Sequence, residues 1–244
     1  MVKNMANKKS LLKSSSVDIL PNFSMRIPTV GEILDDESSY YGIVSTLTAS
    51  PFQYMVQLDD MGIDYSQISD YELFTMLFPM YAQSDMSILF GDLDTSDFNI
   101  YINETNNSKV IYSPRNDILI DELVYHDFAD MVRKINLFEK VKYKPGNESA
   151  RKYLLEKERK KLKRNAKKPY EPYLEKLVIA LVNTSEFPYN YETCMDLSIY
   201  NFNQSFKQIQ HKIAFDNTMI GVYAGTVDTS KMNDKNILSW VSNK

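Results

Sequence analysis

The sequence has few of the residues that build disulfides, metal centres and cofactor loops. Among 244 residues it has one cysteine, two histidines, seven glycines and one tryptophan. Cys194 alone can form neither an intramolecular disulfide nor a thiolate zinc site, and scarce glycine disfavours the close backbone approach that nucleotide loops need. No run of eighteen apolar residues and no signal peptide is visible. We therefore expect a soluble protein of a reducing cytoplasm, with no membrane association, cofactor or metal.

The chain is rich in apolar residues and tyrosine, and its positive and negative charges lie in different segments. Apolar residues make up 43% of it and 17 residues are tyrosine, so a hydrophobic core is expected, in one large domain or two small ones. The net charge is −4, yet ten of the 28 cations fall between Arg151 and Lys168, where only Glu156 and Glu158 oppose them. The rest of the chain is therefore strongly acidic.

The first half of the chain combines helical and strand patterns. Thr29 precedes Glu32 by three residues, which is the capping-box spacing and predicts a helix from about residue 30. Mixed three- and four-residue apolar spacings predict three short helices across 40–78. Alternation in 98–112, with a turn at Asn106 and Asn107, predicts a β-hairpin, to which 88–94 could add a third strand.

The second half carries helical patterns only. We expect a helix across 118–138, whose apolar face includes Leu123 and Phe128, and two further helices across 174–184 and 197–213. Asp196 is the expected N-cap of the last of these. A final short helix should follow an Asn233 or Asp234 cap.

These patterns together predict an α+β fold, mainly α. It has N-terminal helices plus a small antiparallel β-hairpin or three-strand sheet, a basic helical connector and a C-terminal helical bundle. We predict a mobile N-terminal arm at 1–18, a mixed α/β domain at 19–140, a basic helix or linker at 141–170 and the helical bundle at 171–244.

The basic segment allows two interpretations. On a helix its cations would surround nearly the whole circumference, which is typical of a solvated helix or a strut between packed elements. Nucleic-acid binding needs cations on a common surface and usually a recognition module, and no such module is visible. We favour the solvated helix, and docking onto the acidic remainder of the chain would use the same charges. Binding of a polyanion stays open, with these candidates: Arg159, Lys160, Lys161, Lys163, Arg164, Lys167 and Lys168.

Candidate catalytic groups do not form a recognised motif. Counting a calcium loop from Asp92 puts Asp97 where glycine is required and Asn103 where glutamate is required, so the match fails. Loop and capping roles are favoured for these aspartates, although a glycosidase pair depends on distances that a sequence does not give. His126 and His211 lie far apart and outside ligand-spaced motifs. Cys194, just ahead of a predicted helix whose dipole would lower its thiol pKa, lacks a Cys-His signature, so we favour core packing.

The segment GVYAGT, 221–226, lacks the lysine of a phosphate loop. A helix ending near Tyr223, with Gly225 as its left-handed C-cap, explains the same residues. Downstream, Leu238 and Trp240 either fold back on the bundle or form a docking surface. We name Tyr223, Leu238 and Trp240 as candidate partner-binding residues.

Several stretches resemble proteins from the tail-morphogenesis region of bacteriophages that infect Gram-positive bacteria. They are RIPTVGEILDD, YMVQLDDMGID, FGDLD, KPGNESARKYLLEKERKKLKRN, LVIALVNT and LSIYNFNQSFKQI followed by GVYAGTVDTSKMNDKNILSW. The last pattern is similar to the closing segment of tail assembly chaperones.

That resemblance implies a non-enzymatic chaperone that binds the tape-measure protein in the host cytoplasm while the tail assembles. The alternative is a structural component of the virion, such as a baseplate, connector or tail-completion protein. The third hypothesis is nucleic-acid binding through residues 151–168. The apolar faces and segregated charge also permit a homo-oligomer. The absence of a convergent polar cluster agrees with an interaction protein.

Overall fold

The computed structural model describes residues 10–104, 107–141 and 145–241. The described part is α+β and mainly helical, as predicted, with two small antiparallel sheets. Its first half begins with a short 3-10 helix, η1 (Leu11–Lys13), and a strand pair. The elements that follow are β1 (Ser16–Leu20), β2 (Phe23–Arg26), α1 (Val30–Asp35), α2 (Glu37–Leu47), α3 (Met55–Asp60), α4 (Asp70–Tyr81) and α5 (Ser87–Phe90).

The second sheet has the order β3-β4-β5, with β3 at Asn99–Ile102, β4 at Lys109–Ser113 and β5 at Ile118–Ile120. The predicted hairpin is confirmed, and Asn107 has the expected positive φ of 54°, whereas Asn106 lies outside the described residues. The third strand was predicted wrongly. Residues 87–90 form α5, and the chain turns at Gly91. The third strand of the sheet is β5, which pairs with β4.

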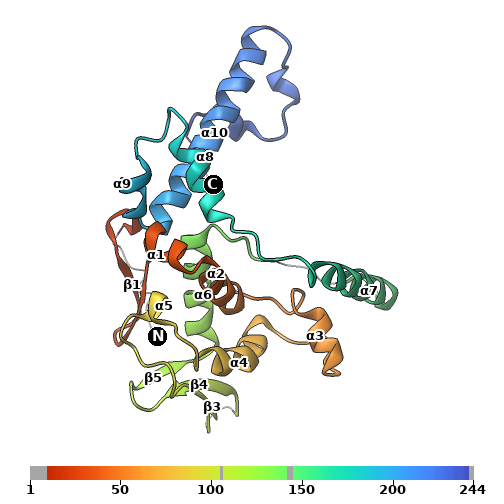
Figure 1. The fold of residues 1–244 in the computed structure, drawn as a ribbon. Coiled ribbons are helices and arrows are strands. Elements are labelled where there is room, and N and C mark those ends of the chain that lie inside the picture. The colour runs from red at the N-terminus through yellow and green to blue at the C-terminus, as the bar shows by residue number, and fades with distance from the viewer. Residues whose placement is uncertain (1–9, 105–106, 142–144, 242–244) are drawn as a thin grey trace.

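The remaining helices are α6 (Glu122–Asn136), α7 (Glu148–Asn165), α8 (Leu174–Val182), α9 (Tyr191–Met195) and α10 (Ile199–Tyr223). Two 3-10 turns follow, η2 (Thr229–Lys231) and η3 (Lys235–Leu238). In Figure 1 the three-stranded sheet lies at one end of the molecule, α10 stands out at the other, and α7 lies to one side.

Local capping chemistry sets several helix starts. The Thr29 hydroxyl accepts from the Glu32 N–H and Glu32 accepts from the Thr29 N–H, so the predicted capping box is confirmed. Asp234 caps η3, also as expected. The prediction of Asp196 as the cap of α10 was wrong, because Ser198 accepts from the Asn201 N–H and Asp196 instead ends α9.

The main core is shared by both halves of the chain. Phe23, Phe90 and Phe128 contact one another through their rings, with centroids 5.3 to 6.0 Å apart. Phe202 of α10 and Leu174 of α8 are fully buried in the same cluster. A smaller separate cluster, here called the satellite core, joins α3, the start of α4 and α7, and includes Met55, Leu58, Tyr65, Leu73 and Leu155.

Two backbone hydrogen bonds fasten the start of α10 to the start of α1. The Val30 N–H donates to the Leu197 carbonyl at 2.8 Å, and the Ile199 N–H donates to the Pro28 carbonyl at 2.8 Å. This short bridge pairs Thr29 with Ser198.

The chain assigned by prediction to an arm at 1–18 is described only from residue 10. From there it is ordered: Leu11 and Val17 are buried in the main core, and Val17 pairs with Met25 across the first hairpin. The division at residues 140 and 170 into domains stays a prediction.

Because both halves of the chain contribute to the main core, the predicted division into domains can be tested by a substitution in that core. Phe202→Ala removes a fully buried ring and should lower the free energy of unfolding by about 3–5 kcal/mol. Hydrogen exchange should show the loss in α4 and α10 alike, since both contribute to one core. Phe215→Ala, in the half-buried outer part of α10, is the matched control and should cost far less. Loss of protection confined to residues after 170 would show instead that the two halves unfold independently.

Candidate protein-docking site

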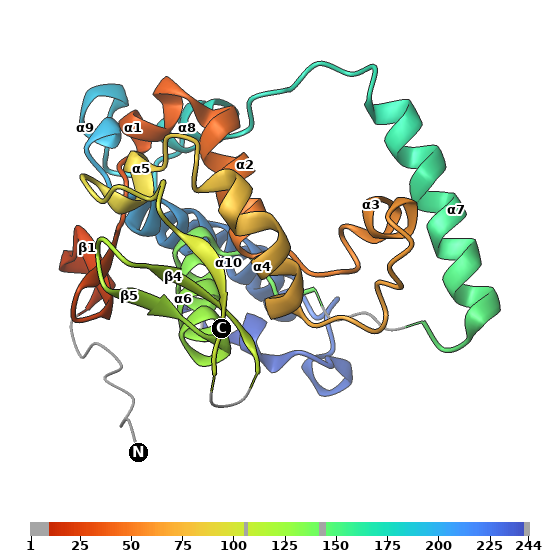
Figure 2. The ribbon, with the colours of Figure 1, turned by 90° about the horizontal axis from the view of Figure 1, so that it is seen from below.

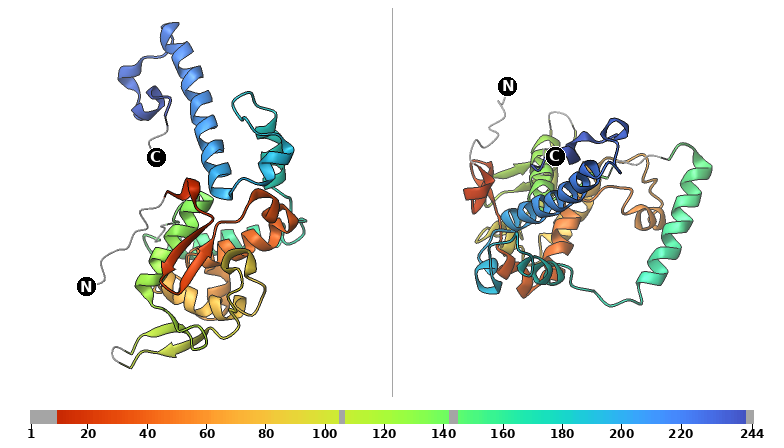
Figure 3. Two further views of the ribbon diagram at one scale, coloured as in Figure 1. Left: turned by 90° about the vertical axis from the view of Figure 1, so that its left-hand side faces the viewer. Right: turned by 90° about the horizontal axis from the view of Figure 1, so that it is seen from above.

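The outer half of α10 stands clear of the body. Its buried residues are Ile199, Phe202, Asn203 and Ile209, and within the described chain no later residue of the helix is buried. Figures 1 and 3 show the outer turns projecting away from the rest of the molecule. We call residues 210–241, which include these turns and the chain that follows them, the C-terminal arm.

The arm turns back on itself after Gly225, whose φ of 71° confirms the predicted left-handed C-cap residue. The Thr226 and Val227 N–H groups donate to the Gly221 carbonyl at 2.9 and 3.1 Å. Further down, the Gln208 amide donates to the Trp240 carbonyl at 2.7 Å, and His211 Nε2 lies 2.6 Å from the Ser239 carbonyl. The returning chain is therefore fixed to α10 at its tip and near its middle.

Exposed apolar side chains follow the arm. Ile213 and Ile220 are seven residues apart on one face of α10 and are 43% and 67% exposed, and Tyr223 beyond them is 84% exposed. Trp240 is 61% exposed, whereas Leu238 is half-buried. We call Ile213, Ile220 and Tyr223 the apolar stripe.

The structure does not bring the three predicted partner-binding residues to one point. Tyr223 lies at the tip, while Trp240 lies beside Gln208, fifteen residues or about 22 Å back along the helix. Ile220 was missed by the sequence analysis, although its seven-residue spacing from Ile213 is a visible signal.

Gly221 allows the return of the chain. A Cβ at this position would lie 2.6 Å from Cγ2 of Val227, whereas a Cβ on the helical Gly42 would meet nothing within 4 Å. We expect Gly42→Ala to stabilise the protein by about 0.5–1 kcal/mol through helix propensity. Gly221→Ala should lose that gain and speed hydrogen exchange in 226–241. Equal stabilisation by both variants, with protection unchanged, would contradict this account.

The basic segment forms α7, which lies apart from the body and touches α3 (Figure 2). Leu155 is buried in the satellite core. One guanidinium nitrogen of Arg159 lies 2.7 Å from Asp59 and 2.5 Å from Asp60, and Arg151 lies 3.8 Å from Asp64. Of the predicted polyanion-binding residues, Arg159 is therefore engaged within the molecule, and Lys161 pairs with Glu158 on the same helix. The others are exposed: Lys160, Lys163, Arg164, Lys167 and Lys168.

Glu37 of α2 fixes the chain between α7 and α8. Its Oε1 accepts from the Tyr170 hydroxyl at 2.9 Å and from the N–H groups of Tyr173 and Leu174 at 2.6 and 3.0 Å. Since α8 has no side-chain cap of its own, this carboxylate from another helix caps it. Burial alone would raise the pKa of Glu37, but these hydrogen bonds outweigh burial and lower the pKa below its ordinary value.

The lowered pKa predicts how pH acts on this contact. A carboxyl whose pKa is lower in the folded state stabilises the protein above its unfolded pKa, and that stability is lost as the pH falls through the folded pKa. Glu37→Gln should therefore lower the free energy of unfolding by about 1–3 kcal/mol near neutral pH. The difference from wild type should shrink in acid, as measured by urea unfolding across a pH series. A difference that stays constant into acid would argue against this role.

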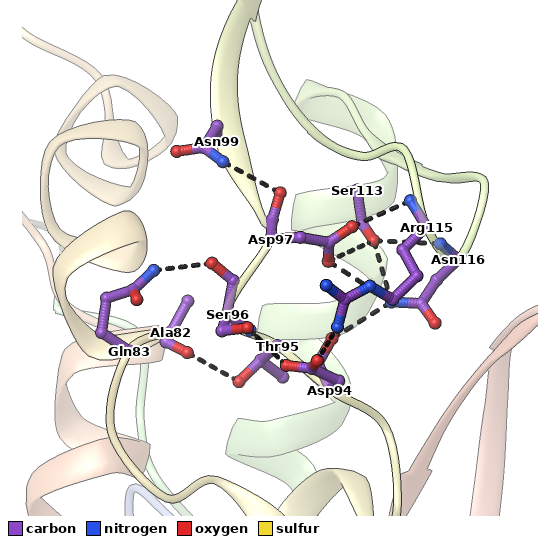
Figure 4. Close-up of polar contacts among 10 residues, drawn as sticks. All are labelled: Ala82, Gln83, Asp94, Thr95, Ser96, Asp97, Asn99, Ser113, Arg115 and Asn116. Atoms are coloured by element: carbon purple, nitrogen blue, oxygen red, sulfur yellow. Dashed lines mark hydrogen bonds and ion pairs between the residues drawn. The ribbon is translucent and has the colours of Figure 1, made fainter.

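Asp94, which ends the FGDLD turn, and Asp97 just after it are hydrogen-bond acceptors (Figure 4). Asp97 accepts from the Ser113 hydroxyl at 2.7 Å and from the Arg115 N–H at 2.8 Å. Asp94 accepts from the Ser96 N–H and pairs with the Arg115 guanidinium. The predicted loop role of these residues is confirmed. Within the described residues no group of three or more His, Cys, Asp or Glu side chains could hold a metal ion.

A surface hollow of about 590 Å³ lies between α4 and the end of the second sheet. Its polar side chains serve the fold. The Tyr71 hydroxyl shares its one proton between the Lys109 and Ile120 carbonyls, each 3.0 Å away, and Asp121 and Glu72 cap the starts of α6 and α4. This hollow therefore presents little free hydrogen-bonding chemistry.

His126 and Cys194 do not meet each other or the acidic turns. His126 lies on α6 with Nε2 3.8 Å from Glu122. Cys194 lies inside α9, fully buried in the main core, which confirms the packing role. Burial raises the pKa of its thiol, so the expected lowering by a helix dipole was wrong.

Residues 163–243 match the model of a domain family described as the YomV second domain. That family is phage-derived, which agrees with the phage resemblance seen in the sequence, and the match covers about a third of the chain. The tail-assembly role stays a prediction. The matched residues include the end of α7, helices α8 to α10 and the C-terminal arm. Searches of curated proteins and of solved structures gave no match. None of the helices in the described residues is long and apolar enough to span a membrane.

Proposed function

We propose that this chain is a non-enzymatic phage assembly protein that binds another tail protein through its C-terminal arm. The observation that carries the proposal is the apolar stripe on the projecting half of α10. Three exposed apolar side chains that follow one another along a projecting helix support a contact surface better than single exposed residues elsewhere do. The phage-derived family match covers this arm.

The partner that fits best is an amphipathic helix of the tape-measure protein. A helix lying along α10 would cover Ile213 and Ile220 with its own apolar face, in the manner of helix recognition by i, i+3 and i+7 anchors. Tyr223 would act as an aromatic anchor at the tip of the contact, whereas Trp240 lies beside Gln208 and His211, on the side of α10 opposite the stripe, and is outside this contact. The acidic body would keep the complex soluble in the host cytoplasm while tube subunits assemble.

A second candidate is a structural component of the virion. It is favoured by β3, an edge strand on which all four residues are exposed, including Ile100, Tyr101 and Ile102. This edge lies at the opposite end of the molecule from the arm (Figure 1). Two contact surfaces at opposite ends suit a subunit held between neighbours, whereas a chaperone needs only one.

Substitutions on the stripe test partner binding. We expect Ile220→Ser combined with Tyr223→Ala to abolish co-purification with co-expressed tape-measure protein and to reduce the amount of soluble partner. Hot-spot side chains of this kind contribute about 2 kcal/mol or more each. Leu123→Ser is the matched control, because Leu123 is 75% exposed on α6 and outside the arm. Unchanged co-purification by the double variant would remove the arm as the binding site.

Mass spectrometry of purified particles separates the two candidates. An assembly chaperone should be missing from mature particles, whereas a virion component should be present at a fixed copy number. Absence from particles, together with failure to bind any tail protein in co-expression, would count against both.

A further inference from the structure

The structure shows which cations of α7 face the body and which lie on the opposite side, with Lys152, Lys161 and Lys163 on the flanks between them. Arg151 and Arg159 lie on the side of Leu155, where they face the acidic residues of α3 and the loop after it. The opposite side carries Tyr153, Lys157, Lys160 and Arg164, at successive intervals of four, three and four residues. We call these four residues the outer face of α7. The sequence alone had suggested cations on nearly every side.

The cations of the outer face are exposed to solvent, and the acidic residue one turn from Lys160 is Glu156. Tyr153 is 65% exposed, and Lys157, Lys160 and Arg164 are exposed. In the part of the chain that the structure describes, none of these three cations pairs with a carboxylate. Figure 2 shows α7 held away from the main body, with α3 on its inner side. The outer face therefore points away from the acidic body.

The inner pairs also leave a local positive excess. The segment from Arg151 to Lys168 carries ten cations, and the acids beside it are Glu148, Glu156, Glu158, Asp59, Asp60 and Asp64. Four positive charges remain in this region of an otherwise acidic protein. Arg159 offsets one of the two negative charges of Asp59 and Asp60, so this pair repels an approaching anion less.

The helix is ordered before any ligand arrives. Asn147 caps its start by accepting from the Ala150 N–H at 2.8 Å, and Leu155 is held in the satellite core. The outer face is therefore a rigid line about 16 Å long from Tyr153 to Arg164. Binding of a ligand to it would cost little backbone conformational entropy. A line of regularly spaced, unpaired cations matches a repeating anion better than a single phosphate or carboxylate.

We propose that the outer face of α7 binds the phosphodiester backbone of nucleic acid, without reading base sequence. Lys157, Lys160 and Arg164 would contact successive phosphates, and Tyr153 would stack on a base where the strand is single. This surface lies on a different helix from the apolar stripe, so it acts independently of the proposed tail-protein contact. An acidic patch on a second copy of the chain is the competing occupant.

The test is fluorescence anisotropy with the full chain and a labelled DNA, as a duplex two turns long and as a single strand of the same sequence. With about three phosphate contacts, the logarithm of affinity should fall with the logarithm of salt with a slope of about −2.7 for the duplex and about −2 for the single strand. The triple variant Lys157→Glu, Lys160→Glu, Arg164→Glu should weaken binding of either DNA more than tenfold, and the corresponding Gln variant should give an intermediate loss. Tyr153→Ala should weaken only the single-stranded complex.

The control is a charge-matched triple variant outside α7, Lys13→Glu, Lys176→Glu, Lys231→Glu, whose lysines are all exposed. It should bind within about threefold of wild type, since long-range charge effects are screened over roughly 10 Å. Circular dichroism on both triples checks that the helices persist. No binding at low salt, or an equal loss in both triples, overturns the proposal. Sedimentation of the protein alone completes the test: an oligomer that the outer-face triple dissociates would assign the face to a second copy and overturn the nucleic-acid proposal.

Discussion

Burial of the first three turns of α10 is the contact on which the rest of the molecule depends. Ile199 and Phe202 are fully buried, and the bridge between Thr29 and Ser198 locks the start of the helix to the start of α1. A helix of 25 residues is about 37 Å long, which exceeds what this core can cover. The outer half must therefore project from the body. The apolar stripe is exposed because only the first turns of α10 are packed in the core.

Local chemistry made much of the fold predictable from sequence. The Thr29 and Glu32 capping box, the hairpin turn at Asn107 and the Gly225 cap depend on residues a few positions apart, so the sequence contains the whole interaction. Short apolar runs were less informative. Residues 118–120 were assigned to a helix but form β5, because pairing with β4 decides their conformation, and a partner strand is invisible in a local pattern.

The candidate sites were harder to predict, because they depend on contacts between distant residues. Tyr223 and Trp240 are both exposed, but their role as partner-binding residues stays a prediction, and their separation along the arm follows from how 226–241 returns along α10. Arg159 was grouped with the other cations, although its partner Asp59 lies 100 residues earlier in the chain. The sequence showed an excess of charge, and only the fold showed which cations are used inside the molecule.

The inner contact of α7 suits arginine. A guanidinium is weakly hydrated and has several donors in a fixed plane, so Arg159 can join Asp59 and Asp60 at a partly covered contact. Lysine ammonium groups are strongly hydrated and resist such burial, which agrees with Lys157 and Lys160 on the outer face, where Arg164 also lies. Exposed ion pairs contribute little alone and weaken in salt, so Leu155 in the satellite core must supply much of the anchoring. Added salt would then weaken ligand binding to the outer face while α7 stays in place. Loss of the ligand can therefore be told apart from loss of the helix.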